Sequence, residues 1–320
     1  MGTGCANVGR QAIIAPIVIA ILLAAVPAAS AREALFGYSD DPDTFEASGN
    51  LIERSDSAVG RVQFLWTDLE PKPGSYAWNE MDAVYNHLLA AGARPLFVVY
   101  GSPEWAQSVP QSGVRPPDDL SAWSDLWSTL ARRYPDAIWQ VWNEPNHPFY
   151  GGDVGLGRIV QLVRLAAQSV HAVDPNARVI GPATSPGVGN WKPYLKAMYR
   201  KLGGRIEVAV NVYPRIPSTW KRDFRAGVNF AERVAGDRRL WVTETGLSRE
   251  QYGGRRQARG SAWMYRRVDR DGLAGIIFHR LAAKSDTTEW DKGLAVTADF
   301  KPLRVFRALR RAVERPPARP

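Results

Sequence analysis

Cysteine is almost absent from the 320 residues, because Cys5 is the only one. The chain therefore cannot form an internal disulfide, and a metal site built on several thiolates is excluded. The four histidines are not arranged in an H-E-x-x-H motif, so we predict no metal and no other cofactor. No G-x-G-x-x-G follows the first predicted strand, which argues against a dinucleotide-binding fold. An internal repeat and a dividing linker are also missing, which indicates one domain.

Acidic residues are in the minority, since 41 Lys and Arg face 32 Asp and Glu and leave a formal net charge of +9. Most of the basic residues are scattered, and the pairs Arg255-Arg256 and Arg266-Arg267 are interpreted as solvated helix faces. No base-stacking motif or recognition helix accompanies the charge, so we predict no nucleic-acid partner. The charge is compatible with an electrostatic association with anionic envelope polymers.

Charged residues are missing from one long segment near the start of the chain. Arg10 precedes an apolar run over Ala12–Ala29, and Ala29-Ser30-Ala31 forms an A-x-A pattern. A positive residue, an apolar run and small residues in this order are typical of a secretory signal peptide. We therefore predict a signal peptide over 1–31, cleavage after Ala31, a secreted protein and no stable membrane span after cleavage. The alternative is an uncleaved membrane anchor, because the run just reaches spanning length.

Short apolar runs alternate with amphipathic stretches along the rest of the chain. The runs cover 34–37, 62–66, 95–100, 138–142, 178–180, 206–210, 240–243 and 275–278, and helical patterns cover 81–91, 120–130, 159–173, 191–202 and 261–268. Asp118-Asp119 precedes one of these patterns as a predicted helix cap. Strands that alternate with helices indicate parallel βαβ units, and eight of them fit a single (β/α)8 barrel over 32–314. An open doubly wound sheet is the alternative, and 315–320 is predicted to be a disordered tail.

Two carboxylates lie at predicted strand ends. Glu144 follows the fourth strand directly before Pro145, and Glu244 lies at the end of the seventh strand. In a (β/α)8 barrel the strand ends form the mouth that carries the active site. A pair of carboxylates that flanks a bound sugar is the minimum machinery for glycoside hydrolysis.

The motifs around these carboxylates resemble those of the clan A (β/α)8 glycoside hydrolases, which include the cellulase family and secreted xylosidase-like families. The matching segments are WNEPN at 142–146, VTETG at 242–246, NVYP at 211–214 and GRV at 60–62. Further similar stretches are EPKPGSYAW at 70–78, SPEWA at 102–106 and DPNARV at 174–179. The resemblance covers essentially all of 34–314.

The resemblance implies a retaining hydrolase that acts on β-linked sugars, and it assigns roles to matching residues. Glu144 would be the acid/base and Glu244 the nucleophile. Asn143 would contact the sugar 2-hydroxyl, Tyr213 would hydrogen-bond the nucleophile, and Arg61 would lie beneath it. Two interpretations remain open. One is a glycosidase of carbohydrate metabolism, and the other is an inactive carbohydrate-binding barrel at the cell envelope.

Four further residues are predicted to contact the glycan substrate, namely Trp105, His147, His279 and Trp290. The eighth strand departs from the family pattern, because it reads Ile276-Ile-Phe278-His279-Arg280 where many members carry a Trp. A cation or an imidazole at this position is expected to favour acidic or heavily hydroxylated sugars.

Overall fold

The computed structural model describes residues 1–2, 34–110, 114–151, 154–282 and 295–314. The predicted signal peptide, apart from residues 1–2, and the tail at 315–320 lie outside the described residues and stay predictions, as does the predicted contact residue Trp290. Within the described ranges, no helix combines the length and the apolar character needed to cross a bilayer.

Eight parallel strands form the centre of the described chain. They are β1 (Leu35–Ser39), β2 (Val59–Leu65), β3 (Arg94–Tyr100), β4 (Ile138–Val141), β5 (Arg178–Ile180), β6 (Val208–Val212), β7 (Leu240–Thr245) and β8 (Gly275–His279). The strand order is β5-β4-β3-β2-β1-β8-β7-β6, and the pairing of β1 with β8 joins the first strand to the last. Each predicted apolar run coincides with a strand, which confirms the (β/α)8 fold and excludes the open doubly wound sheet.

The ring closes between β5 and β6 at Glu207. Ile180 and Glu207 form a parallel bridge, and the Glu207 amide donates to the Val179 carbonyl at 2.8 Å. The Glu207 carboxylate accepts two hydrogen bonds from Arg178, at 3.0 and 2.8 Å, and one from the indole of Trp241. A buried carboxylate that accepts three hydrogen bonds from two side chains therefore stabilises the contact between these strands.

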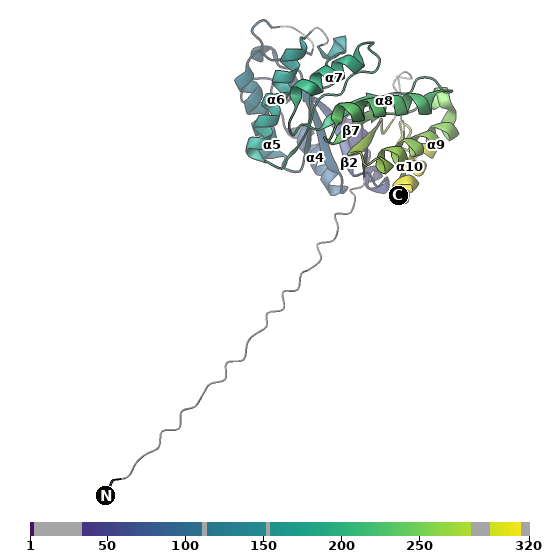
Figure 1. The fold of residues 1–320 in the computed structure, drawn as a ribbon, viewed down its shortest axis with the longest axis horizontal. Helices are drawn as coiled ribbons and strands as arrows, with labels where there is room; N and C mark the ends of the chain where they lie inside the picture. Colours follow the sequence, from purple (N-terminus) through teal and green to yellow (C-terminus); the bar gives the residue numbers. More distant parts are fainter. Residues whose placement is uncertain (3–33, 111–113, 152–153, 283–294, 315–320) are drawn as a thin grey trace. The chain divides into compact units, whose positions relative to one another are not determined.

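The helices lie outside the strands, as Figure 1 shows for α4 to α10 around β2 and β7. They are α1 (Pro42–Ala47), α2 (Leu51–Arg54), α3 (Trp66–Leu69), α4 (Asn79–Ala90), α5 (Leu120–Arg133), α6 (Leu156–Val173), α7 (Trp191–Leu202), α8 (Trp220–Ala235), α9 (Arg249–Arg270) and α10 (Arg304–Glu314). Two one-turn 3-10 helices, η1 (Glu104–Ala106) and η2 (Pro148–Tyr150), lie in loops. The predicted cap of α5 is confirmed at Asp119, whose side chain accepts from the Ala122 amide at 2.9 Å.

The helix prediction was incomplete after β6. It missed α8 and α10, and it recognised only the second half of α9. The first half of α9 is rich in arginine and glycine, and the helix is kinked at Gly253, where φ is 68°. Such a segment has a weak apolar period, and glycine lowers helix propensity.

Tryptophan supplies much of the core. Six tryptophans of the described residues are fully buried: Trp139 and Trp241 lie within β4 and β7, Trp66 and Trp142 directly follow β2 and β4, and Trp123 and Trp127 lie on α5. Trp127 and Trp139 pack edge to face at 5.9 Å, and Trp123 packs in the same way against Trp142 at 6.3 Å. Large aromatic side chains bury a large area and fix their neighbours, and in this way they hold the end of β4 rigidly.

Candidate active site

The carboxyl ends of the strands surround one open cavity of about 1120 Å³. Its walls include both predicted catalytic residues, Glu144 and Glu244, and the predicted contact residues Asn143, Tyr213 and Arg61. His147 and His279 line it as well. The barrel therefore brings these residues together from five different strands and the turns that follow them.

Glu144 is aimed into the cavity by a turn directly after β4. Trp142 and Glu144 have positive φ angles of 68° and 36°, which place both residues in the left-handed region of the backbone. Trp142 anchors the turn because its indole is buried and donates to the Tyr150 carbonyl at 2.9 Å. Two bonds fix the far side of the turn: the Asn146 side chain accepts from the Ser185 amide at 2.8 Å and donates to the Ser185 carbonyl at 3.2 Å.

Glu244 occupies a different environment from Glu144. Its Oε1 lies 2.8 Å from Nη1 of Arg61, and its Oε2 accepts a hydrogen bond from the Tyr213 hydroxyl at 2.9 Å. The registers of β6 and β8 against β7 both shift near this residue, and such irregularities re-aim side chains at strand ends. The side chain of Glu244 is therefore held in place by one cation and one hydroxyl.

Arg61 is a fully buried cation that supports this arrangement. Its Nε donates to Oε1 of Gln140 at 2.9 Å, and its Nη2 donates to Oδ1 of Asn143 at 3.2 Å. The guanidinium thus connects the nucleophile candidate to β4 and to the turn that carries Glu144. Because a buried charge is costly unless it is paired and hydrogen-bonded, Arg61 requires the Glu244 carboxylate as its counter-ion.

The side chain of Glu144 accepts a hydrogen bond from Nδ2 of Asn211 at 2.8 Å, and Oδ1 of Asn211 accepts from the Thr243 hydroxyl at 2.9 Å. Burial of Glu144 and, second, the negative charge of Glu244 raise the pKa of Glu144 from its ordinary value to about 7. A carboxyl group with this pKa is still largely protonated in weakly acidic solution, so it can donate a proton while its neighbour is ionised.

The pKa of Glu144 leads to a pH prediction. Since the acid must be protonated to act, kcat/KM should fall as the pH rises through about 7. In the variant Glu244→Gln the repulsion is lost while burial remains, so the pKa of Glu144 should move down and stay above its ordinary value. A carbon-13 NMR titration of the Glu144 carboxyl measures this shift directly. Glu250→Gln, at an exposed site on α9, is the control and should leave the titration unchanged, and an unchanged titration in Glu244→Gln would contradict the prediction.

The wall formed by β1 and β8 carries His279 and Arg280. The Nδ1 atom of His279 lies 2.8 Å from the Ser39 hydroxyl, and its ring packs edge to face on Tyr213 at 6.4 Å. Burial lowers the pKa of His279, which favours the neutral imidazole. Arg280 donates to the Asp40 carboxylate at 3.1 and 2.7 Å and to Asp41 at 2.6 Å.

The structure places both the imidazole and the cation expected at this position in the cavity wall, and the preference for acidic or heavily hydroxylated sugars stays a prediction. Arg280 lines the cavity, but two carboxylates neutralise its charge, and Asp40 is fixed further by the Ala282 amide at 2.9 Å. Sequence analysis missed Asp40, although it stands at the end of the first strand, where a strand-end search for polar residues would have found it. Phe149 and Tyr150 lie in η2, the 3-10 helix that follows Glu144, and they also line the cavity. The sequence-based prediction did not include them.

The prediction for Trp105 does not agree with its position. Trp105 is not among the residues that line the cavity. Its indole donates to the Glu70 carbonyl at 3.0 Å, and its ring packs edge to face on Trp66 at 5.4 Å. It is therefore a packing residue of the third loop. His147 does line the cavity, and its Nδ1 accepts from the Phe149 amide at 3.2 Å at the start of η2.

Within the described residues, no group of three or more His, Cys, Asp or Glu side chains is arranged to hold a metal ion. Glu144 and Glu244 face the cavity in different surroundings, which an arginine, a tyrosine and two asparagines provide.

Comparisons with known proteins agree with this geometry. A model of the glycosyl hydrolases family 39 matches residues 67–213, a stretch that includes Glu144 and ends before Glu244. A β-xylosidase of Geobacillus stearothermophilus is 29% identical over 149 residues, and one of Caldicellulosiruptor saccharolyticus is 28% identical over 156 residues. These matches cover 42% and 44% of this chain, and the chain spans only 29% and 32% of those two proteins.

The crystal structure of a monomeric β-xylosidase from Caulobacter crescentus CB15 has a TM-score of 0.67 to this chain at 20% identity. That match covers 87% of this chain and 67% of the other. The barrel fold and these matches together make the chain similar to the glycoside hydrolases of clan A. Within the clan, its segment 67–213 is similar to family 39.

Proposed function

We propose that the protein is a retaining glycosidase that hydrolyses β-linked O-glycosidic bonds of an oligosaccharide or polysaccharide. The observation that carries the proposal is the difference between the surroundings of Glu144 and Glu244, which line the same cavity. Glu244 is paired with Arg61 and Tyr213, whereas the pKa of Glu144 is raised to about 7. This division into a carboxylate and a carboxylic acid is what the double-displacement reaction requires.

In the first step Glu244 attacks the anomeric carbon and forms an ester with the sugar. The bond to the leaving oxygen breaks, and that oxygen takes the proton of Glu144. The negative charge of Glu244 is now consumed, so repulsion no longer raises the pKa of Glu144. In the second step Glu144 accepts a proton from water, the water oxygen attacks the anomeric carbon, and Glu244 leaves as a carboxylate. The sugar is released with its original anomeric configuration.

The remaining contacts fit this reaction. Asn143 is oriented by Arg61 and lines the cavity beside Glu144, where it would bind the sugar 2-hydroxyl. The Asn211 amide would hold Glu144 during both proton transfers. His147 and His279 are proposed to contact hydroxyl groups of the glycan, with His279 acting as a neutral imidazole.

Turnover of nitrophenyl β-glycosides tests the proposal, with β-xyloside, β-glucoside, β-galactoside and β-mannoside in one panel. We expect hydrolysis of at least one of them, and proton NMR should detect the β-anomer as the first product. An α-anomer as first product would refute the retaining mechanism. Binding of the sugars without turnover would favour the alternative, an inactive carbohydrate-binding barrel at the cell envelope.

We also propose that the protein is exported. The support is the order of Arg10, the apolar run and the A-x-A pattern at the start of the chain. The exported protein should begin at Arg32 when its N-terminus is sequenced. An exported protein that still begins at Met1 or Gly2 would contradict cleavage and would leave the membrane anchor as the explanation.

A further inference from the structure

Seven exposed arginines gather between α9 and α10, away from the cavity described above. Two hollows of about 370 and 890 Å³ lie along these helices, and both are lined by Arg255, Arg304 and Arg307. The shared residues make the two hollows one continuous depression, called here the arginine groove. Its arginines are Arg249, Arg255, Arg259 and Arg266 from α9 and Arg304, Arg307 and Arg311 from α10.

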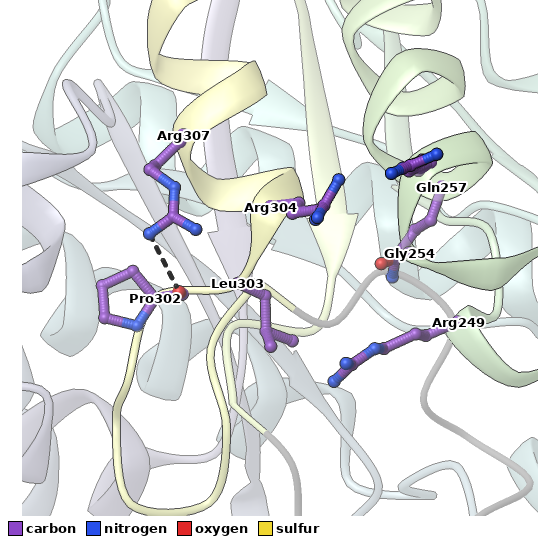
Figure 2. Close-up of a pocket in the computed structure, with 8 residues that line it drawn as sticks. Arg249, Gly254, Gln257, Pro302, Leu303, Arg304 and Arg307 are labelled. Atoms are coloured by element: carbon purple, nitrogen blue, oxygen red, sulfur yellow. Dashed lines mark hydrogen bonds between the residues drawn. The ribbon is translucent and has the colours of Figure 1, made fainter.

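The groove follows from the spacing of arginines on two adjacent helices. Arg255 and Arg259 are four residues apart, and Arg307 and Arg311 repeat this interval, so each pair lies on one face of its helix. From Arg255 to Arg266 the row extends about 16 Å, given a rise of about 1.5 Å per residue. Figure 2 shows the guanidinium groups of Arg249 and Arg304 extending from opposite sides into the space between the helices.

The groove arginines differ from other arginines on the same helices. Arg267 and Arg270 pair with Asp271, and Arg310 pairs with Asp56 and Glu314. Within the described residues, by contrast, none of the seven groove arginines forms an ion pair with a carboxylate. Arg307 donates a hydrogen bond of 3.4 Å to the Pro302 carbonyl, which is an uncharged acceptor. Like charges gathered in this way repel one another, and an anion would relieve that repulsion.

We propose that the arginine groove binds a linear anionic polysaccharide. A long, positively charged depression suits a chain with regularly repeated carboxylate groups, since guanidinium groups bind carboxylates through two parallel hydrogen bonds. The pairs Arg255-Arg256 and Arg266-Arg267 were interpreted from the sequence as solvated helix faces. The proposal revises this interpretation for Arg255 and Arg266, which line the groove. Anions would therefore bind to the groove on the outer helices α9 and α10. Arg280, the cation in the cavity wall, is already neutralised by Asp40 and Asp41.

Two other classes of polyanion fit the groove less well. Trp263 lines it, but Arg225 and Lys221 lie 5.1 and 5.7 Å from its ring centroid and Trp220 packs against it at 5.2 Å. This ring is therefore not free to stack on bases, as proteins that bind single-stranded nucleic acids require. A bilayer surface is disfavoured because the large exposed apolar residues of the described chain, such as Phe149 and Ile216, lie outside the groove.

Binding of polygalacturonate by the full chain tests the proposal. The groove variant combines Arg255→Gln, Arg259→Gln and Arg311→Gln. The control combines Arg54→Gln, Arg132→Gln and Arg200→Gln, three exposed arginines outside the groove, so both proteins lose the same charge. At low salt the groove variant should bind at least ~10-fold more weakly than the unmodified protein, because clustered positive charges raise the local concentration of the anion. The affinity of the control should change by less than ~2-fold.

Two ligand controls accompany the variants. Methyl-esterified polygalacturonate, the same chain without charge, should not bind, and high salt should remove the difference between the variants because it screens exposed charges. Turnover of a neutral nitrophenyl glycoside should be unchanged in the groove variant, so failure of this proposal is distinguishable from failure of the proposed hydrolysis. Equal loss of binding in both triple variants would overturn the groove as the site. Preferential binding of single-stranded DNA or of phosphatidylglycerol vesicles would overturn the polysaccharide as its partner.

Discussion

Replacing Glu244 with alanine is expected to lower kcat at least ~10⁴-fold, because in the proposed mechanism the covalent glycosyl ester forms on this carboxylate. Small added azide should enter the vacated space and attack the anomeric carbon directly. The product would be a glycosyl azide of inverted configuration, and Glu144 would still supply the proton to the leaving group. NMR of the azide product identifies the configuration.

The result for Glu244 needs a folding control, because its removal leaves Arg61 without its counter-ion. Glu244→Gln keeps the shape of the side chain and should be equally inactive. Circular dichroism and thermal unfolding should show that both variants retain the barrel, although a buried unpaired cation is expected to lower their stability. Glu104→Ala, an exposed carboxylate in η1, should retain full activity. Substantial activity in a folded Glu244→Gln would remove Glu244 as the nucleophile.

Replacing Glu144 with alanine should have an effect that depends on the leaving group. A disaccharide needs the proton, and its hydrolysis should slow by ~10³-fold or more, whereas a dinitrophenyl glycoside should lose little in the first step. The second step also slows without a general base, so the glycosyl ester should accumulate and give a burst of dinitrophenolate. Azide should then attack the ester and yield a product of retained configuration.

The two azide products together assign the roles. A retained azide from Glu144→Ala and an inverted azide from Glu244→Ala support the proposed assignment. The opposite pair of configurations would exchange the roles of the two residues. Inactivity of Glu144→Ala toward the dinitrophenyl glycoside, in a variant that unfolds normally, would contradict its role as the acid/base.

The juxtaposition of Glu144 and Glu244 could be predicted from sequence because the carboxyl ends of all parallel strands lie at the same end of a barrel, whereas Arg61 lies inside β2 and was assigned by the family resemblance. Once strands are assigned by their apolar runs, polar residues at their carboxyl ends must meet there. Short buried strands carry a strong apolar signal, and for this reason all eight were found. The same reasoning succeeded for Tyr213, which follows β6 directly and reaches Glu244.

Other features depend on contacts that no local pattern records. Asp40 and Arg280 are 240 residues apart and meet only because β1 pairs with β8. Trp105 was expected in the cavity, but the backbone carbonyl of Glu70 holds its indole in the loop. The arginine groove escaped notice because the helical character of 249–260 is obscured by glycine and arginine, so the alignment of α9 with α10 could not be anticipated.

The turn after β4 has a consequence for the evolution of this protein. Trp142 and Glu144 both occupy the left-handed region, which costs a residue with a side chain about 1 to 2 kcal/mol. At position 144 a buried carboxyl group adds to this cost. The substitution Glu144→Gly would relax the backbone and remove the carboxyl group. Thermal stability and the proposed catalysis therefore favour different residues at position 144. A screen for thermal stability alone would therefore enrich variants that keep the barrel and lack the Glu144 carboxyl group.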